Sequence, residues 1–430
     1  MLMDELARRV EEASIKLAAA GSEVKNKALA HIAEALNARK DEIIKANQED
    51  LDRSEREKLS APLLKRLKFD EEKIADVVDG IYSLIMLEDP VGKTEFSTGL
   101  DDNLELYRVT CPIGVIGVIF ESRPDALVQI STLCLKSGNG VLLKGGSEAL
   151  ETNRILAEVI IHAAEEAGIP SNWAALLETR SDVNEMLKMD RYIDLIIPRG
   201  SNDFVRYIMD NSKIPVMGHA DGICHCYVDE DADLEMAVKI VVDSKTQYVA
   251  VCNAAETLLV HENVAPEFLP AAKKLLDAKG VELVGCSKTQ ALIPAGSATE
   301  EDWRTEYLDY KLSVKVVAGI DEAIDHINLY GSGHTDAIIT GNREKAARFM
   351  DYVDSGNVFW NCSTRFSDGF RYGFGAEVGI STSKIHSRGP VGLDGLVIYK
   401  YKLLGSGHVV EDYANHSRTF KHLKLNKEFR

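Results

Sequence analysis

One cysteine stands where a thiol could act as a nucleophile. Cys252 follows a helical pattern of apolar residues at 234–242 and precedes an apolar run at 257–260, which predicts a helix-to-strand connection. A short loop between rigid elements can hold a thiol at a cleft while its backbone N–H groups remain available to an oxyanion. The alternative is a small buried thiol with a packing role, which most free cysteines have.

Two glycine turns have the composition of phosphate-binding sites. Lys144-Gly145-Gly146-Ser147 and Arg199-Gly200-Ser201 each follow an apolar run and precede a helical pattern. Glycine lets the backbone approach a phosphate, the helix N-terminus favours the anion, and the basic residue adds charge. An ordinary tight turn between strand and helix explains the first motif equally well. Together, two such turns in one sheet could straddle a dinucleotide.

A third motif contains the residue types that bind zinc. His219 precedes the run Cys224-His225-Cys226. In a strand, however, the two cysteines of the run point to one face and His225 to the other, and no second ligand pair stands at zinc spacing. We therefore expect no metal site in this motif.

Residues 361–375 are dense in polar side chains and glycine, and they include Arg365 and Arg371. With Arg123, they are cations that a net acidic chain would place locally to hold an anionic substrate. His334 lies in a glycine-rich loop after a helical pattern at 320–329. Its position alone favours a structural role over a catalytic one.

Composition excludes several classes of protein. The chain has 430 residues, 50 of them basic and 68 acidic, so its net charge of −18 disfavours nucleic acid as a partner. No stretch approaches the roughly 20 apolar residues that span a bilayer, so we expect no membrane association. The seven cysteines are scattered and follow no CxxC pattern, as in a reducing cytosol. We expect a cytoplasmic protein of two or three domains.

The elements around these motifs are those of an α/β protein. Helical patterns fill residues 4–90, and three strand-then-helix units follow in 113–210, typical of a parallel sheet with its ligand at the carboxyl ends of the strands. After Cys252 the alternation resumes. The polar runs at 94–98 and 104–110 predict an exposed hairpin, and the tail at 396–403 can pair with it. Two such excursions predict an oligomerisation flap.

Several long motifs resemble the γ-glutamyl phosphate reductases, also called glutamate-5-semialdehyde dehydrogenases, over nearly the whole chain. The motifs are VAGIDEAIDHINLYGSGHTDAI at 317–338, IFESRPD at 119–125, LLKGGSEA at 142–149, PRGSN at 198–202, GHADGICHCYVDEDADL at 218–234, CNAAETLLVH at 252–261 and FRYGFGAEVGIST at 370–382. The resemblance implies an aldehyde-dehydrogenase-like fold. It consists of a parallel-sheet NADPH-binding domain at 1–93 and 111–248, an α/β catalytic domain at 249–395, and a β-hairpin oligomerisation flap with a tail at 94–110 and 396–430.

The resemblance also implies a reaction and a set of site residues. NADPH would reduce L-glutamyl 5-phosphate to L-glutamate 5-semialdehyde and phosphate through a thioester on Cys252, the second step of L-proline synthesis from L-glutamate. His219 takes the position of the water-activating glutamate of related aldehyde dehydrogenases, and Ser122 that of their oxyanion-binding asparagine. The expected catalytic residues are Cys252, Asn253 and His219. The expected cofactor-binding residues are Lys144, Gly145, Ser147, Gly200, Ser201 and Glu306. The expected substrate-binding residues are Glu121, Ser122, Arg123, His334, Asn361, Arg365 and Arg371.

The expected assembly is a homo-dimer or tetramer, with a glutamate 5-kinase as a candidate partner. Two alternatives remain beside this reading. One is a broad NAD(P)-dependent aldehyde dehydrogenase, which would act on free aldehydes without phosphate. The other is a non-catalytic scaffold that keeps the fold to bind a kinase, since fold alone does not prove activity.

Overall fold

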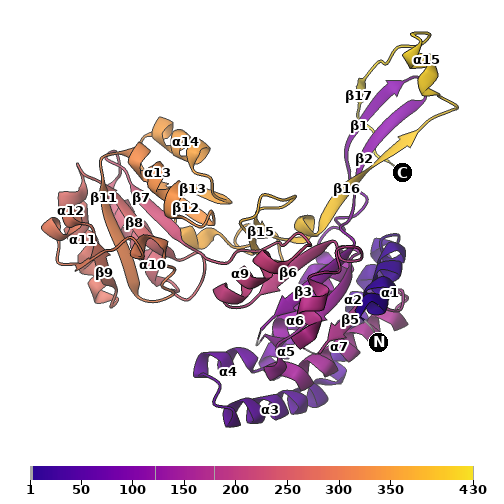
Figure 1. Ribbon diagram of the computed structural model, residues 1–430, viewed down its shortest axis with the longest axis horizontal. Coiled ribbons are helices and arrows are strands. Elements are labelled where there is room, and N and C mark those ends of the chain that lie inside the picture. The colour runs from indigo at the N-terminus through magenta and orange to yellow at the C-terminus, as the bar shows by residue number, and fades with distance from the viewer. Residues whose placement is uncertain (1–2, 122, 179, 430) are drawn as a thin grey trace. The chain divides into compact units, whose positions relative to one another are not determined.

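The computed structural model of the chain describes residues 3–121, 123–178 and 180–429, with the side chains of 61–62 and 180–182 outside the description. It divides into two compact units (Figure 1). The first comprises residues 1–201, 207–216 and 392–430, and the second comprises 202–206 and 217–391. Helix α9 (Asn202–Asn211) is shared between them. Both units contain a parallel sheet, which confirms the predicted α/β class.

The first unit is built on a four-stranded parallel sheet in the order β5-β4-β3-β6. Its two central strands are buried along their whole length, as the continuous apolar runs predicted for a sheet covered on both faces. Because the strands are parallel, the turns after β4 and β6 lie at the same edge of the sheet. The strands are β3 (Val115–Phe120), β4 (Gly140–Lys144), β5 (Ala174–Leu177) and β6 (Leu195–Arg199).

Helices surround this sheet, and most of the early ones are amphipathic. Val10, Ala13 and Leu17 form the buried stripe of the first helix, at the helical spacing that the sequence predicted. The helices are α1 (Met3–Leu17), α2 (Ser22–Ala38), α3 (Lys40–Arg56), α4 (Ala61–Leu67), α5 (Glu71–Met86), α6 (Pro124–Lys136), α7 (Leu150–Glu166) and α8 (Arg180–Met186).

A separate antiparallel sheet contains the predicted hairpin and tail in the order β16-β2-β1-β17. The tail strand pairs with the hairpin along its whole length, from Val397 opposite Pro112 to Leu404 opposite Glu105, as expected. The elements are β1 (Thr94–Asp101), β2 (Leu104–Pro112), β16 (Val397–Leu404), α15 (Val410–Ala414) and β17 (Leu423–Leu425).

The second unit contains a seven-stranded sheet in the order β10-β9-β11-β8-β7-β12-β13, in which every neighbouring pair is parallel. A small antiparallel hairpin of β14 (Gly379–Ser381) and β15 (Gly389–Val391) belongs to the same unit. The sheet strands are β7 (Cys224–Val228), β8 (Ala255–His261), β9 (Glu282–Gly285), β10 (Gly296–Ser297), β11 (Lys311–Val317), β12 (Thr335–Ile339) and β13 (Asn357–Trp360).

Helices cover both faces of this sheet (Figure 1). Cys226 and Val228 of β7 belong to the apolar core beneath α10 and α11, while Tyr227 between them packs on the opposite face with residues of α13 and α14. The alternation predicted for the Cys224–Cys226 run is therefore present. The helices are α10 (Leu234–Thr246), α11 (Ala265–Ala278), α12 (Ser287–Leu292), α13 (Ile320–Tyr330) and α14 (Arg343–Tyr352). Over the described parts of both units, no helix is long and apolar enough to cross a membrane.

Candidate active site

Cys252 lies in the connection between α10 and β8, where the sequence placed it, and its side chain is partly exposed. A buried ion pair joins the two ends of this connection. Lys245 Nζ at the end of α10 lies 2.6 Å from Glu256 Oε2 in β8, and both side chains are fully buried. Burial raises the pKa of Glu256 to about 7 and lowers the pKa of Lys245, because desolvation outweighs the attraction between the two groups. Breaking this pair would leave a buried charge without a partner. The pair therefore fixes the end of α10 against the start of β8, on either side of Cys252.

Close backbone packing fixes the position of Cys252 within the connection. A Cβ on Gly222 would lie 2.2 Å from Cys252 O and 2.4 Å from Cys252 Cα, so only glycine fits there. The Cys224 thiol, at the start of β7, donates to the Cys252 carbonyl at 3.1 Å. Two residues that precede or begin β7 thus determine where the Cys252 backbone runs.

Two histidines flank the Cys252 sulfur. One donor atom each from His219, Cys252 and His334 lies within 4.8 Å of the others, and the two imidazole rings meet edge to face at 4.8 Å between centroids. His219 Nδ1 lies 2.7 Å from Ile380 O; since a carbonyl can only accept, Nδ1 carries the proton. The Nε2 atom of neutral His219 is then the one with a lone pair. The structure therefore brings His219, Cys252 and His334 together, from three separate segments.

Asn253 anchors the same connection to the polar segment that follows β13. Its Nδ2 donates to Ser367 O at 2.7 Å, and its carbonyl accepts from Thr364 Oγ1 at 2.7 Å. Its side-chain oxygen is buried and has no hydrogen-bond partner among the described residues. An unpaired buried acceptor is unusual and marks this position as one that a ligand could complete.

Arg365 is a buried cation on this segment, in the 3₁₀ turn Thr364–Phe366. Its Nε donates to Gln247 Oε1 at 2.9 Å, and within the described chain it forms no ion pair with a carboxylate. Burial lowers the pKa of Arg365, and so does the nearby Arg371, whose guanidinium donates to Arg365 O at 2.9 Å. Cys252, Asp368 and Asp243 oppose this shift. Two adjacent guanidinium groups, one of which has no carboxylate within ion-pair distance among the described residues, favour an anion between them and Cys252.

Asn361 and Glu306, two other predicted site residues of this unit, have different surroundings. Asn361 closes a turn after β13 with a φ of 55°, and its side-chain amide bonds the backbone N–H and carbonyl of Thr340 at 2.9 and 3.0 Å. That pairing is structural, so a substrate contact through Asn361 stays a prediction. Glu306 bonds Asn202 and interacts with Gly222 and His219, and burial raises its pKa. Glu306 therefore lies beside the residues around Cys252, within the same unit.

The predicted cofactor turns lie in the first unit, at the carboxyl edge of its sheet. Lys144 is buried at the end of β4, and its ammonium bonds Gly145 O. Asp50 of α3 accepts from Thr152 N at 2.8 Å and Glu151 N at 3.2 Å, so a carboxylate already occupies the first N–H groups of α7. A ligand at this turn would therefore contact the side chains of the turn rather than the N–H groups that begin α7.

The second turn brings together Glu121 and Ser201, two predicted site residues of the first unit. Glu121, after β3, accepts from the Ser201 N–H at 2.9 Å beside Gly200, so the structure joins a residue predicted for the substrate to one predicted for the cofactor. Arg123 directly precedes α6, and its guanidinium lies 3.5 Å from the Asp125 carboxylate. Ser122 lies outside the described residues.

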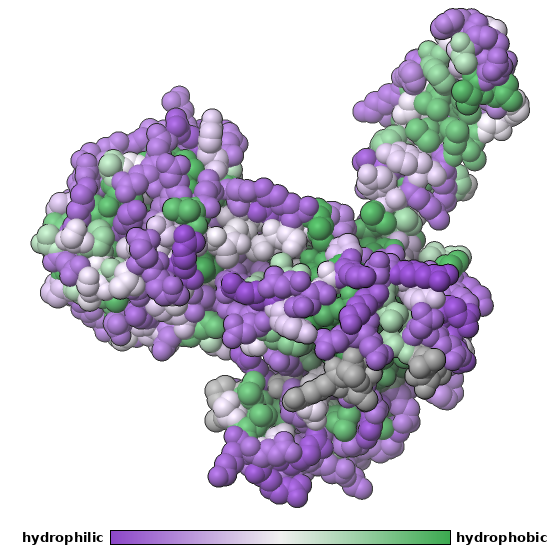
Figure 2. Space-filling model, viewed as in Figure 1, coloured by the Kyte–Doolittle hydropathy of each residue, from purple (hydrophilic) through white to green (hydrophobic). Residues whose placement is uncertain are grey.

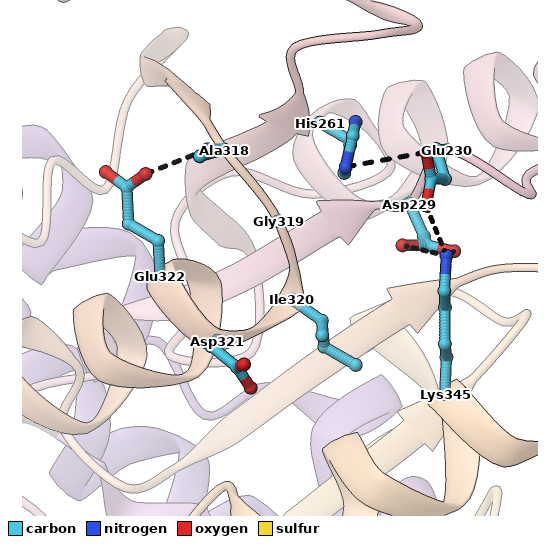
Figure 3. A pocket seen from close by; sticks show the side chains of 9 residues that line it. All are labelled: Asp229, Glu230, His261, Ala318, Gly319, Ile320, Asp321, Glu322 and Lys345. Carbon is cyan, nitrogen blue, oxygen red and sulfur yellow. Dashed lines mark hydrogen bonds and ion pairs between the residues drawn. The ribbon is translucent and has the colours of Figure 1, made fainter.

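The second unit has a hollow at the edge of its sheet opposite to Cys252 (Figure 3). Cys252, Cys224 and His334 lie at the amino ends of β8, β7 and β12, whereas this cavity of about 390 Å³ lies where β7, β8 and β11 end. Its charged groups all have ion-pair partners, some within the cavity and some outside it. Lys345 Nζ is 3.2 Å from Asp229 and 2.8 Å from Glu230. The pairing of Lys345 with these carboxylates, and the position of the cavity at the edge of the sheet opposite to Cys252, make it the weaker candidate.

Known proteins of similar sequence and structure define the class of enzyme to which this chain belongs. Residues 4–284 match the aldehyde dehydrogenase family, and the chain belongs to that family of oxidoreductases. A γ-glutamyl phosphate reductase of Acetivibrio thermocellus is 77% identical over 429 residues, covering 100% of both chains. One of Pelotomaculum thermopropionicum is also 77% identical, covering 100% of this chain and 99% of that one. The crystal structure of the γ-glutamyl phosphate reductase of Thermotoga maritima is 43% identical, with a TM-score of 0.93 over 95% of this chain and 99% of that one. Within the aldehyde dehydrogenases, the chain belongs to the γ-glutamyl phosphate reductases, which confirms the resemblance found in the sequence.

Sequence reasoning missed several residues of the site. Lys245 and Glu256 flank Cys252 in the sequence, and a charged residue directly before the apolar run at 257–260 was the available signal for a buried pair. Gly222 and Cys224 carry no local signal of their approach to Cys252. Arg53 of α3 donates to Ser147 O and Glu148 O at 3.1 Å each, which adds a second cation at the predicted cofactor turn.

Proposed function

We propose that this chain reduces L-glutamyl 5-phosphate to L-glutamate 5-semialdehyde and phosphate, with NADPH as reductant, in the synthesis of L-proline from L-glutamate. The observation that carries the proposal is the Cys252 thiol held on a clamped connection between His219 and His334. The name shared by the relatives supports the substrate, since it names a reductase of γ-glutamyl phosphate.

The first chemical step is acyl transfer to Cys252. His219, whose Nδ1–H is held by Ile380 O, accepts the thiol proton at Nε2, and the thiolate attacks the acyl carbon. The bond from carbon to the phosphate oxygen breaks, phosphate leaves, and a thioester remains on Cys252. The N–H groups of Cys252 and Asn253 stabilise the oxyanion. Reduction of the thioester and collapse of the resulting thiohemiacetal release the aldehyde and restore Cys252.

The residues of the first unit fit a phosphorylated dinucleotide by their chemistry. Lys144 supplies positive charge at this turn, and the Ser147 hydroxyl can donate to a phosphate. Arg53, which is paired with Asp50, donates to Ser147 O and holds the turn. A 2′-phosphate is repelled by a carboxylate and attracted by this set, which supports NADPH over NADH. Gly200 and Ser201 would hold the second part of the cofactor. When bound, NADPH supplies the hydride for the thioester.

The substrate anions fit the cations of the second unit. Arg365, buried and without a carboxylate partner among the described residues, binds the phosphate or the α-carboxylate in a bidentate way, together with Arg371. Binding an anion there relieves the repulsion between the two guanidinium groups.

The donor group around Cys252 also favours phosphate over water as the acyl acceptor in the reverse direction. Two histidines and no carboxylate make up that group in the described chain. A carboxylate base would activate water and hydrolyse the thioester, whereas phosphate needs no such base. Glu306, the carboxylate that interacts with His219, already accepts from Asn202 and Gly222, which supports this preference.

One experiment tests the whole proposal. NADP reduction by glutamate semialdehyde should require phosphate, and free aldehydes without phosphate should give no comparable rate. Cys252→Ser should keep its fold but lose activity by several orders of magnitude, whereas Cys286→Ser, which removes another partly exposed thiol of the same unit, should keep it. If Cys252→Ser kept more than a tenth of wild-type turnover, the mechanism would be wrong.

The antiparallel sheet is the proposed contact between subunits. Its edge strand β16 exposes Ile398, Tyr401 and Leu403, and hydrophobic residues gather over this sheet at the upper right of Figure 2. An exposed apolar edge strand usually pairs with another chain. Tyr401→Lys should therefore lower the mass measured by light scattering; an unchanged mass would place the contact elsewhere. A glutamate 5-kinase stays a predicted partner, because its product would be the labile acyl phosphate.

A further inference from the structure

His219, Cys252 and His334 have the composition of a transition-metal site. They offer two imidazoles and one thiolate, with donor atoms within 4.8 Å of one another. Zinc sites use this ligand set, with water in the fourth position when the site is open. The group contains no carboxylate from the described residues, so it does not suit calcium or magnesium, which prefer oxygen ligands.

A second observation concerns His334 itself. Its side chain is completely buried, and its Nε2 atom has no hydrogen-bond partner within the described structure. Its Nδ1 atom lies 2.8 Å from Thr335 Oγ1, and Asn357 Nδ2 donates to His334 O at 3.0 Å. A buried ring nitrogen without a partner is costly unless something completes it.

The surroundings also resemble the outer shell of a metal site. Metal-binding histidines generally donate their other ring N–H to a protein oxygen, which fixes the tautomer and the ring orientation. His219 donates in this way to Ile380 O at 2.7 Å. The Thr335 hydroxyl oxygen lies next to the Nδ1 atom of His334 in the same manner. Both rings are therefore oriented by their neighbours.

We propose that His219, Cys252 and His334 bind Zn²⁺, or a divalent metal of similar softness, as a reversible inhibitory ligand. Tetrahedral zinc with bonds of about 2.0 and 2.3 Å places its ligand atoms about 3.3–3.6 Å apart. The atoms here need to close by about 1 Å. Rotation about the Cα–Cβ bond of Cys252 moves its sulfur while the backbone stays in place, and His219 lies outside regular helix and strand, so these two ligands can supply the movement. His334 directly precedes β12, and its carbonyl accepts from Asn357 Nδ2.

Zinc binding has a defined chemical consequence. The metal binds the Cys252 thiolate, the thiol proton is released, and the sulfur lone pair is no longer available to an acyl carbon. The metal site itself is independent of the proposed function, whereas inhibition rests on it. The site also differs from the Cys224-His225-Cys226 run. His225 pairs there with Asp336 at 2.9 Å, and Cys226 is buried in the apolar core.

Cobalt(II) titration tests the site without measuring activity, because a thiolate bound to Co²⁺ gives a charge-transfer absorption band. The purified full chain should bind one Co²⁺ with this band, and Zn²⁺ should displace it. Cys252→Ser should abolish the band. His334→Gln should weaken Co²⁺ binding at least about tenfold, and Cys286→Ser, the matched control, should change neither. Alkylation of Cys252 in the wild-type protein should also abolish the band. This measurement needs no variant, so a folding defect cannot explain its result.

The outcomes separate the metal site from the proposed function. A band that persists in Cys252→Ser, or an unchanged affinity in His334→Gln, overturns the metal site. If the band depends on Cys252 but Cys252→Ser keeps its turnover, the metal site stands and the proposed nucleophile is wrong. With both correct, Zn²⁺ inhibits turnover, EDTA restores it, and His334→Gln needs at least tenfold more Zn²⁺ for the same fractional inhibition.

Discussion

Replacing Gly222 by alanine should misplace the nucleophile without touching it. The added methyl would lie 2.2 Å from Cys252 O, 2.4 Å from Cys252 Cα and 2.5 Å from Cys252 Cβ. Ordinary contacts of such a carbon begin near 3.4 Å, so the Cys252 backbone must move by about 1 Å. The backbone of residue 222 does not have a positive φ, so the effect is steric alone.

This shift has a calculable cost. Overpacking of this kind costs about 1–3 kcal/mol of stability, and a displacement of about 1 Å at a reacting group can cost about 100-fold in rate. We expect kcat of Gly222→Ala to fall about 100-fold, with a moderate decrease in Tm. Steady-state kinetics, thermal melting and the rate of Cys252 alkylation measure these effects.

The matched control is Gly80→Ala. Gly80 lies inside α5, and a Cβ there would meet nothing within 4 Å, so activity should not change and stability should rise slightly. The reasoning would be refuted by a Gly222→Ala enzyme with kcat within twofold of wild type and unchanged Cys252 alkylation. Such a result would show that the connection adjusts freely around residue 222.

Three further predictions concern pH, cofactor choice and substrate binding. Burial, with smaller effects of His225 and Lys315, lowers the pKa of His326 from 6.5 to about 2. Below pH 6.5 the unfolded chain therefore binds a proton that the folded chain does not, and at pH 5 this removes about 2 kcal/mol of stability. His326→Leu should lack this loss in urea unfolding at pH 5 against pH 7.5; an identical pH dependence would contradict it. Ser147→Glu should shift the ratio of kcat/KM for NADPH over NADH by ~1–3 kcal/mol toward NADH, and an unaltered ratio would show that the adenosine phosphate lies elsewhere. Arg365→Lys should raise KM for the semialdehyde or for phosphate, and no change in either would remove Arg365 from the site.

The sequence predicted most elements because their apolar patterns are local. The helical pattern at 234–242 lies within α10, whose N-cap Asp233 accepts from Met236 N at 2.9 Å, and the apolar run at 257–260 lies within β8. Strands β9 and β10 were not predicted, because four and two residues are too few to show a period of two. Cys252 was placed correctly between helix and strand for the same local reason.

The neighbours of Cys252 could not be predicted in this way. Cys224 and His334 approach it because β7 lies between β8 and β12, with Cys224 opposite Ala255. Strand order and register depend on the whole core, and no spacing in the chain records them. The same holds for Asp50, which meets Thr152 across 102 residues of sequence.

The contact of Asp50 with α7 limits how far this chain can be shortened. The carboxylate on α3 accepts from Thr152 N and Thr152 Oγ1, and Arg53 one turn later bonds Ser147 O. A truncated enzyme that starts after α3 would expose the first N–H groups of α7. The predicted cofactor turn would also lose its contact with Arg53. Engineers seeking a minimal reductase should therefore keep these early helices.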